Sequence, residues 1–141
     1  MSRRAARELS MKVLFDMHMN NDFDLNRIEY HLEEESIGER QHDYIYGVLT
    51  MAVNNLAQID KIIEGYSKGW KLDRIANVDL AILRLALSEI LYMKDISYRI
   101  SINEAIELAK IYGSDETPSF INGILGKYVE NEGLKNDEQD R

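Results

Sequence analysis

Cysteine is absent from the 141-residue chain, and proline and glycine are scarce, with one Pro and eight Gly. The lack of cysteine excludes disulfides, thiolate zinc sites and thiol nucleophiles, and it is compatible with a cytoplasmic location. Because few Pro and Gly residues interrupt the chain, long continuous segments remain. This favours helices over a sheet fold with many turns.

Long hydrophobic runs are also missing. No segment approaches the roughly 20 consecutive apolar residues that cross a bilayer, and the arginines near the start are not followed by the apolar stretch of a signal peptide. Apolar residues make up 45% of the chain and charged residues 30%, which is typical of an ordinary globular domain. We therefore expect a soluble cytoplasmic protein of one domain, with no membrane partner.

The sequence lacks the motifs of common catalytic sites. It contains no G-x-x-x-x-G-K-[ST] loop, no G-x-G-x-x-G and no G-x-S-x-G, which are typical of phosphate, dinucleotide and hydrolase sites. His18, His31 and His42 lie thirteen and eleven residues apart in separate predicted segments, so they do not form a metal-binding pattern. We expect neither enzymatic activity nor a cofactor nor a metal site.

Positive charge is in deficit overall but concentrated at one end. Seventeen Lys and Arg against 25 Asp and Glu give a net charge of −8, which on average repels nucleic acid. The first twelve residues nevertheless carry Arg3, Arg4, Arg7 and Lys12 against Glu8, a net +3 that leaves −11 for the other 129. The arginines occupy the first two turns of a predicted helix, where the helix dipole disfavours cations by about 0.3–1 kcal/mol each. This pattern predicts a cluster that gathers anions, with a frayed, solvated N-terminus as the alternative.

Apolar residues recur at helical spacing along most of the chain. The predicted helices cover about 3–19, a short segment after Asp24, 39–66, a central apolar segment at 73–92, one that begins at Ser101 and one that begins at Thr117 and ends near 131. No segment shows the alternation of a strand, so the predicted fold class is all-α. Residues 132–141 are polar, and we expect a flexible tail there.

Short signals mark the last helices. Ser101 and Glu104 fit the S-x-x-E pattern, which predicts a capping box. Gly113 is placed to end that helix in a left-handed conformation. Thr117 and Pro118 predict the next start, with Thr as the cap and Pro at the first helical position.

Two further residues are candidates for function. Phe120 falls in the first turn of the last predicted helix, where a flat ring could stack on an RNA base, although it could equally be a core residue. Asp79 lies near the start of the central helix, where the helix dipole favours a carboxylate.

Several segments together resemble the NusB family, which comprises small all-helical bacterial transcription antitermination factors. The order and spacing match from about 2 to 128. The matching segments are R-R-A-A-R-E at 3–8, V-D-L-A-I-L-R-L-A at 78–86, E-I-L-Y at 89–92, I-N-E-A-I-E-L-A-K at 102–110 and F-I-N-G-I-L at 120–125.

This resemblance implies two small helical bundles with about seven helices in total, at about 1–69 and 70–131, which together form one RNA-binding domain. It also implies a non-enzymatic antitermination factor that binds boxA RNA of ribosomal RNA leader transcripts together with the ribosomal protein NusE. Such a factor joins the RNA polymerase antitermination complex and promotes processive elongation. A homodimer is left open.

By the same resemblance, RNA contact is expected at Arg3, Arg4, Arg7 and Phe120, and Asp79 is expected on a partner or RNA surface. Two alternatives remain. One is an RNA-binding module related to the N-terminal domain of ribosomal RNA cytosine methyltransferases, although the chain has neither a Cys nucleophile nor a glycine-rich cofactor loop. The other is a protein-interaction adaptor that makes no RNA contact.

Overall fold

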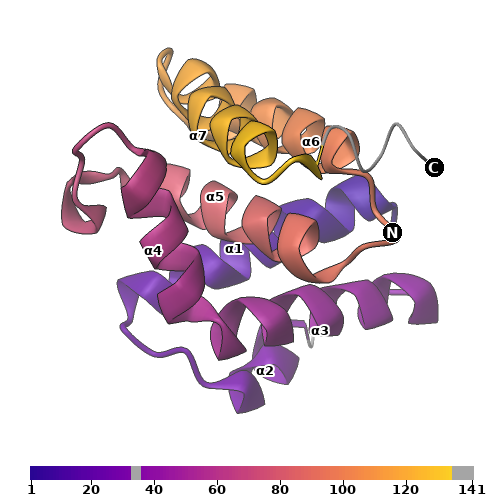
Figure 1. Cartoon of the computed structure of the whole chain (residues 1–141). Helices are drawn as coiled ribbons and strands as arrows, with labels where there is room; N and C mark the ends of the chain where they lie inside the picture. The colour runs from indigo at the N-terminus through magenta and orange to yellow at the C-terminus, as the bar shows by residue number, and fades with distance from the viewer. Residues whose placement is uncertain (33–35, 135–141) are drawn as a thin grey trace.

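A computed structural model describes residues 1–32 and 36–134, which fold into seven α-helices and two short 3₁₀ turns without a strand (Figure 1). The elements are α1 (Arg3–Met19), η1 (Leu25–Arg27), α2 (Ile28–Leu32), α3 (Glu39–Asn54), α4 (Leu56–Tyr66), η2 (Leu72–Arg74), α5 (Asn77–Tyr92), α6 (Tyr98–Tyr112) and α7 (Thr117–Asn131). The predicted all-α class is confirmed. Within the described ranges no helix is long and apolar enough to cross a membrane. Most of the predicted tail, 135–141, lies outside the described residues.

Helix α5 is the centre of the fold. It packs against α1, α3, α4, α6 and α7, and every residue from Leu80 to Ile90 is buried. The central position predicted from its lack of a polar face is therefore confirmed. Burial of each large apolar side chain contributes about 1.5–3 kcal/mol, and α5 contributes more buried apolar residues to the core than any other described helix.

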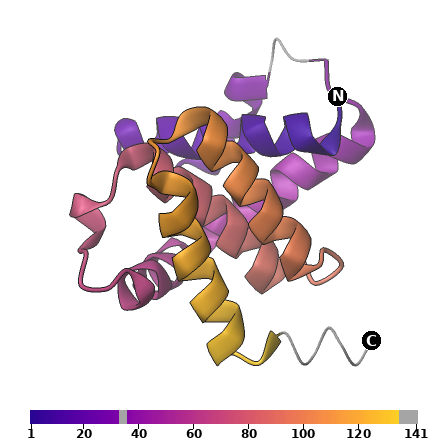
Figure 2. The ribbon, with the colours of Figure 1, turned by 90° about the horizontal axis from the view of Figure 1, so that it is seen from above.

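The other helices cover α5 from different sides. Helices α6 and α7 run side by side as an antiparallel pair, while α1 and α3 pack against α5 elsewhere (Figure 2). One hydrophobic core joins the two groups of helices. The division into two bundles near residue 70 stays a prediction, because α5 packs on both groups.

The prediction of one helix over 39–66 is wrong, because the segment breaks at Asn55 into α3 and α4. The Asn55 backbone leaves the helical region, with φ −121° and ψ 22°, and its side-chain amide donates to the Met51 carbonyl at 2.9 Å. Such a local hydrogen bond from an Asn side chain competes with the backbone hydrogen bonds of the helix. The apolar spacing continues across the break because both helices bury their apolar face against the same core.

The boundaries of α5 and α6 also differ from the prediction. Helix α5 begins at Asn77 rather than at 73, because η2 and an extended residue, Ile75, precede it. Helix α6 begins at Tyr98, where the Ser97 hydroxyl oxygen accepts from the Arg99 N–H at 3.2 Å. The predicted capping box at Ser101 is therefore wrong, since Ser101 lies inside the helix.

The turn between α6 and α7 corrects two further predictions. Gly113 has φ −92° and ψ −174°, so its backbone is extended and not left-handed. Glycine is needed there for space, because a Cβ would lie 2.5 Å from the Thr117 side chain. Thr117 is the first residue of α7 and Glu116 occupies the cap position, so the prediction of Thr117 as the cap is wrong. Pro118 is the second helical residue rather than the first, but it still lies in the first turn, where its missing N–H is no loss.

Candidate nucleic-acid interface

The three N-terminal arginines occupy the first two turns of α1, as predicted. The helix is capped by Ser2, whose hydroxyl oxygen accepts a hydrogen bond from the Ala5 N–H at 3.0 Å. The start of the chain is thus an ordered helix end rather than the frayed terminus considered as the alternative. The arginines then differ from one another in burial and in partner.

Arg7 is buried and paired with a carboxylate that lies 82 residues away in the sequence. Its side chain is 7% exposed, and its Nε and Nη2 donate to the two oxygens of Glu89 at 2.8 and 3.3 Å. Glu89, on α5, also accepts from the Tyr44 hydroxyl of α3 and from the Ser101 hydroxyl of α6 at 2.8 Å. Four helices therefore meet at one buried carboxylate whose hydrogen-bonding capacity is used.

The Arg7 guanidinium stays protonated although it is buried. Burial lowers the pKa of Arg7, but the hydrogen bond and the charge of Glu89 outweigh burial and raise that pKa overall. Burial, followed by the charge of Glu89, raises the pKa of Tyr44 well above its usual range. The phenol therefore stays protonated and acts as a hydrogen-bond donor to Glu89.

Arg4 lies on the surface and pairs with Glu104 of α6. Its Nε and Nη2 donate to the two carboxylate oxygens, each at 3.1 Å. The hydrogen bond and the charge of Glu104 raise the pKa of Arg4. The Arg4 side chain remains 64% exposed, whereas that of Glu104 is 16% exposed.

Arg3 makes neutral contacts instead of an ion pair. Its Nε donates to the Gln41 side-chain oxygen at 2.7 Å, and its guanidinium lies 4.3 Å from the centre of the Tyr44 ring. A cation over an aromatic face is favourable, and within the part of the chain that the structure describes no carboxylate pairs with Arg3. Among the described residues, Glu89 pairs with Arg7 and Glu104 with Arg4, so the cluster is less positive than the three arginines alone suggest.

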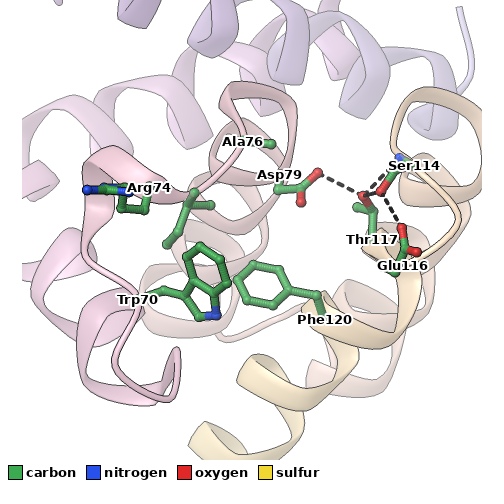
Figure 3. Close-up of a pocket in the computed structure, with 9 residues that line it drawn as sticks. Trp70, Arg74, Ala76, Asp79, Ser114, Glu116, Thr117 and Phe120 are labelled. Atoms are coloured by element: carbon green, nitrogen blue, oxygen red, sulfur yellow. Dashed lines mark hydrogen bonds between the residues drawn. The ribbon is translucent and has the colours of Figure 1, made fainter.

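A second candidate site is a hollow of about 260 Å³ between the start of α5 and the start of α7. The ring of Phe120 is half-buried and lies beside the indole of Trp70 at this hollow (Figure 3). Both rings also line an adjoining hollow of about 190 Å³. Trp70 is 54% exposed, so an aromatic surface is open to solvent there.

Asp79 lines the same hollow as Phe120. It lies in the first turn of α5, as predicted, and its Oδ1 accepts from the Thr117 hydroxyl at 3.0 Å (Figure 3). Burial raises the pKa of Asp79, and the Thr117 hydrogen bond offsets part of that rise. The carboxylate therefore ties the start of α7 to the start of α5.

The structure separates the predicted residues into two places. Arg7 contacts Glu89 near the end of α5, whereas Asp79 lies ten residues earlier in the same helix, which corresponds to about 15 Å along the axis. Phe120 and Asp79 are brought together, but the arginines lie at the other end of α5. Between the two places Lys12 of α1 lies 5.3 Å from the centre of the Tyr112 ring of α6.

Sequence reasoning missed Glu89, Tyr44 and Gln41 as partners of the arginines and Trp70 as the neighbour of Phe120. The isolated acidic residue in the apolar run of α5 is a signal for Glu89, because a buried carboxylate needs a partner. Nothing local in the sequence indicates which arginine is that partner. Among the residues that the structure describes, no group of His, Cys, Asp or Glu could hold a metal ion.

The fold and the site together define a small helical protein with a cationic helix end and an exposed aromatic pair, supported by one central buried helix. The NusB family model matches residues 4–130, and a transcription antitermination protein NusB from Alkaliphilus oremlandii is 73% identical over 134 residues, covering 95% of this chain and 97% of that protein. The chain belongs to the NusB family of transcription antitermination proteins. The expectation of a non-enzymatic factor agrees with this family.

Other relatives and solved structures agree with this family assignment. The transcription antitermination protein NusB from Bacillus velezensis is 44% identical over 125 residues, covering 89% of this chain and 93% of that protein. The structure of NusB from T. maritima has a TM-score of 0.85 and 35% identity, with 92% of each chain covered. The crystal structure of antitermination factors NusB and NusE in complex with dsRNA has a TM-score of 0.82 at 23% identity, covering 92% of this chain and 96% of that chain, which shows the shared fold.

Proposed function

We propose that this protein binds boxA RNA of ribosomal RNA leader transcripts together with NusE, and thereby joins the RNA polymerase antitermination complex in the cytoplasm to promote processive elongation. Family membership supports this proposal, as does the complex of a related fold with NusE and RNA. The single observation that carries it is the cationic edge at the start of α1, which the exposed Arg4 and the half-buried Arg3 form.

The two outer arginines are suited to phosphate. The two hydrogen bonds from Arg4 to Glu104 use Nε–H and one N–H of Nη2, whereas a guanidinium has five N–H donors. The remaining donors of this 64% exposed side chain can reach a phosphate oxygen. Arg3, which has no carboxylate partner among the described residues, adds a second charge beside it.

Arg7 has a different role in this proposal. Because Glu89 holds its guanidinium in the core, Arg7 positions the start of α1 rather than meeting RNA at the surface. The expected contribution of Arg7 to RNA binding is therefore indirect, through the orientation of Arg3 and Arg4.

The Trp70 and Phe120 rings support a second contact. Base stacking on an aromatic side chain contributes about 1–3 kcal/mol per base and tolerates any base. We propose that an unpaired RNA base stacks at this hollow, and that Asp79 acts there by holding the start of α7 in place. The charge of −11 outside the first twelve residues suits a basic ribosomal protein as the other partner.

The dependence of RNA affinity on salt tests the arginine edge. Each single-strand phosphate contact contributes about −0.7 to the slope of log K against log salt. We expect the Arg3→Ala/Arg4→Ala variant to weaken binding of a boxA oligonucleotide and to flatten the slope by up to about 1.4. The control, Lys61→Ala/Lys127→Ala, removes the same charge from exposed positions on α4 and α7.

Equal slopes for the arginine variant and the lysine control would contradict the proposed edge.

Light scattering of the protein with and without RNA tests whether it forms a homodimer. We expect that a homodimer, if it forms through the start of α1, dissociates when RNA is added.

A further inference from the structure

We infer that Glu104 sets the affinity of this protein for RNA by competing with phosphate for Arg4. The inference rests on the proposed RNA binding at the start of α1. It concerns a residue of α6 that lies 100 positions away from Arg4 in the sequence and is brought beside it by the fold.

The geometry places Glu104 between two arginines. Its oxygens accept from Arg4 Nε and Nη2 at 3.1 Å, and Oε1 lies 4.0 Å from Nη1 of Arg7. A carboxylate and a phosphate offer a guanidinium the same pair of acceptor oxygens. Glu104 therefore occupies the edge of Arg4 that an RNA phosphate would otherwise take in the same two-bond geometry.

The two carboxylates of this region differ in how easily a phosphate could displace them from their arginines. Glu89 is 1% exposed and accepts from three residues on three other helices, so its exchange would break the core. Glu104 is less buried, with its side chain 16% exposed, and within the described ranges its ion pairs are with Arg4 and Arg7. An incoming phosphate can displace Glu104 from Arg4 without opening the core.

This competition lowers the affinity for RNA in two ways. A phosphate that takes the inner edge of Arg4 must first displace Glu104, and a phosphate that binds the outer edge is repelled by the negative charge across the same guanidinium. The result is an edge that holds RNA weakly unless a second contact is added. An additional partner such as a protein bound to the same RNA would supply that contact.

The test compares two variants that remove the same charge from one helix. Glu104→Gln removes the proposed competitor, whereas Glu107→Gln removes a more exposed carboxylate that pairs with Lys110 at 3.3 Å. Binding of a fluorescent boxA oligonucleotide is measured at low salt for the full chain. We expect Glu104→Gln to tighten binding about fivefold or more and Glu107→Gln less than about twofold, because the first charge lies closer to Arg4 and is less screened by solvent.

The same pair of variants is then made in the Arg4→Ala background. If Glu104 acts through Arg4, the gain from Glu104→Gln falls there to the gain from Glu107→Gln. Equal gains from the two variants in the otherwise unchanged chain, or weaker binding of Glu104→Gln, would overturn the inference. Weaker binding would show that Glu104 holds Arg4 in place for RNA.

The proposed function fails in a different way. If Arg4→Ala binds RNA as tightly as the unchanged chain, then Arg4 is not part of the RNA edge, and both proposals are overturned. If Arg4→Ala weakens binding while Glu104→Gln behaves like Glu107→Gln, only the inference about Glu104 fails. Thermal unfolding of each variant checks that the fold is retained.

Discussion

Replacement of Glu89 by Ala is expected to be among the most destabilising single changes in the core that surrounds the start of α1. The carboxylate is 1% exposed and accepts two hydrogen bonds from Arg7, one from Tyr44 and one from Ser101. Its removal leaves the buried Arg7 guanidinium with only the more distant Glu104 carboxylate, 4.0 Å away, as a counter-charge. Breaking a buried ion pair in this way typically costs about 3–5 kcal/mol.

That loss is large relative to the total free energy of unfolding. The free energy of unfolding of a domain is about 5–15 kcal/mol, so Glu89→Ala would remove a third or more of it in most of that range. For a chain of this size we expect the melting temperature to fall by about 10–15 °C. Chemical denaturation with urea, followed by helical circular dichroism, measures the free energy of unfolding directly.

Two control variants separate the ion pair from its surroundings. Tyr44→Phe removes one hydrogen bond to a charged group and should cost only about 1.5 kcal/mol. The double variant Arg7→Met/Glu89→Leu removes both charges and keeps most of the volume, so it should be more stable than Glu89→Ala alone. A cost below about 1 kcal/mol for Glu89→Ala, or a double variant less stable than Glu89→Ala, would refute this account of the network.

Three further predictions concern the hollow and the turn before α7. Trp70→Ala should weaken RNA binding by about five- to 150-fold, the equivalent of about 1–3 kcal/mol for one stacked base. Thermal unfolding should change little because the residue is 54% exposed, and unchanged RNA affinity would exclude Trp70 from the site. Asp79 has its pKa raised above the ordinary 3.8 by burial, so the folded state binds more protons and stability declines as pH rises from 3.8 through the folded value. Asp79→Asn should remove that decline in urea titrations at several pH values, and a persistent decline would assign it to other groups. Gly113→Ala should destabilise by about 1–3 kcal/mol through overpacking, because its Cβ would lie 2.5 Å from the Thr117 side chain; an unchanged melting temperature would show that the turn can relax.

The sequence predicted the elements that depend on local pattern. The start of α1, the buried position of α5 and the placement of Pro118 in the first turn of α7 follow from spacing and capping preferences, and the structure agrees. The break at Asn55 was missed because α3 and α4 bury their apolar faces against one core. The periodic signal therefore continues across a kink that a single Asn creates.

The candidate site was less predictable because its partners are distant in the sequence. The capping box assigned to Ser101 and Glu104 fails since both side chains make tertiary contacts, Ser101 with Glu89 and Glu104 with Arg4. The S-x-x-E pattern carries no information about such contacts. In the same way, the excess of arginine at the chain start was visible, but the burial of Arg7 depends on a carboxylate 82 residues away.

The most direct test of the proposed role is the coupling between RNA and protein partners. The affinity of this protein for a boxA oligonucleotide should be measured with and without saturating NusE, and its affinity for NusE with and without the RNA. The account predicts that each partner tightens the other by the same factor, because coupling between two sites in one complex is reciprocal. RNA affinity that is the same with and without NusE would contradict it.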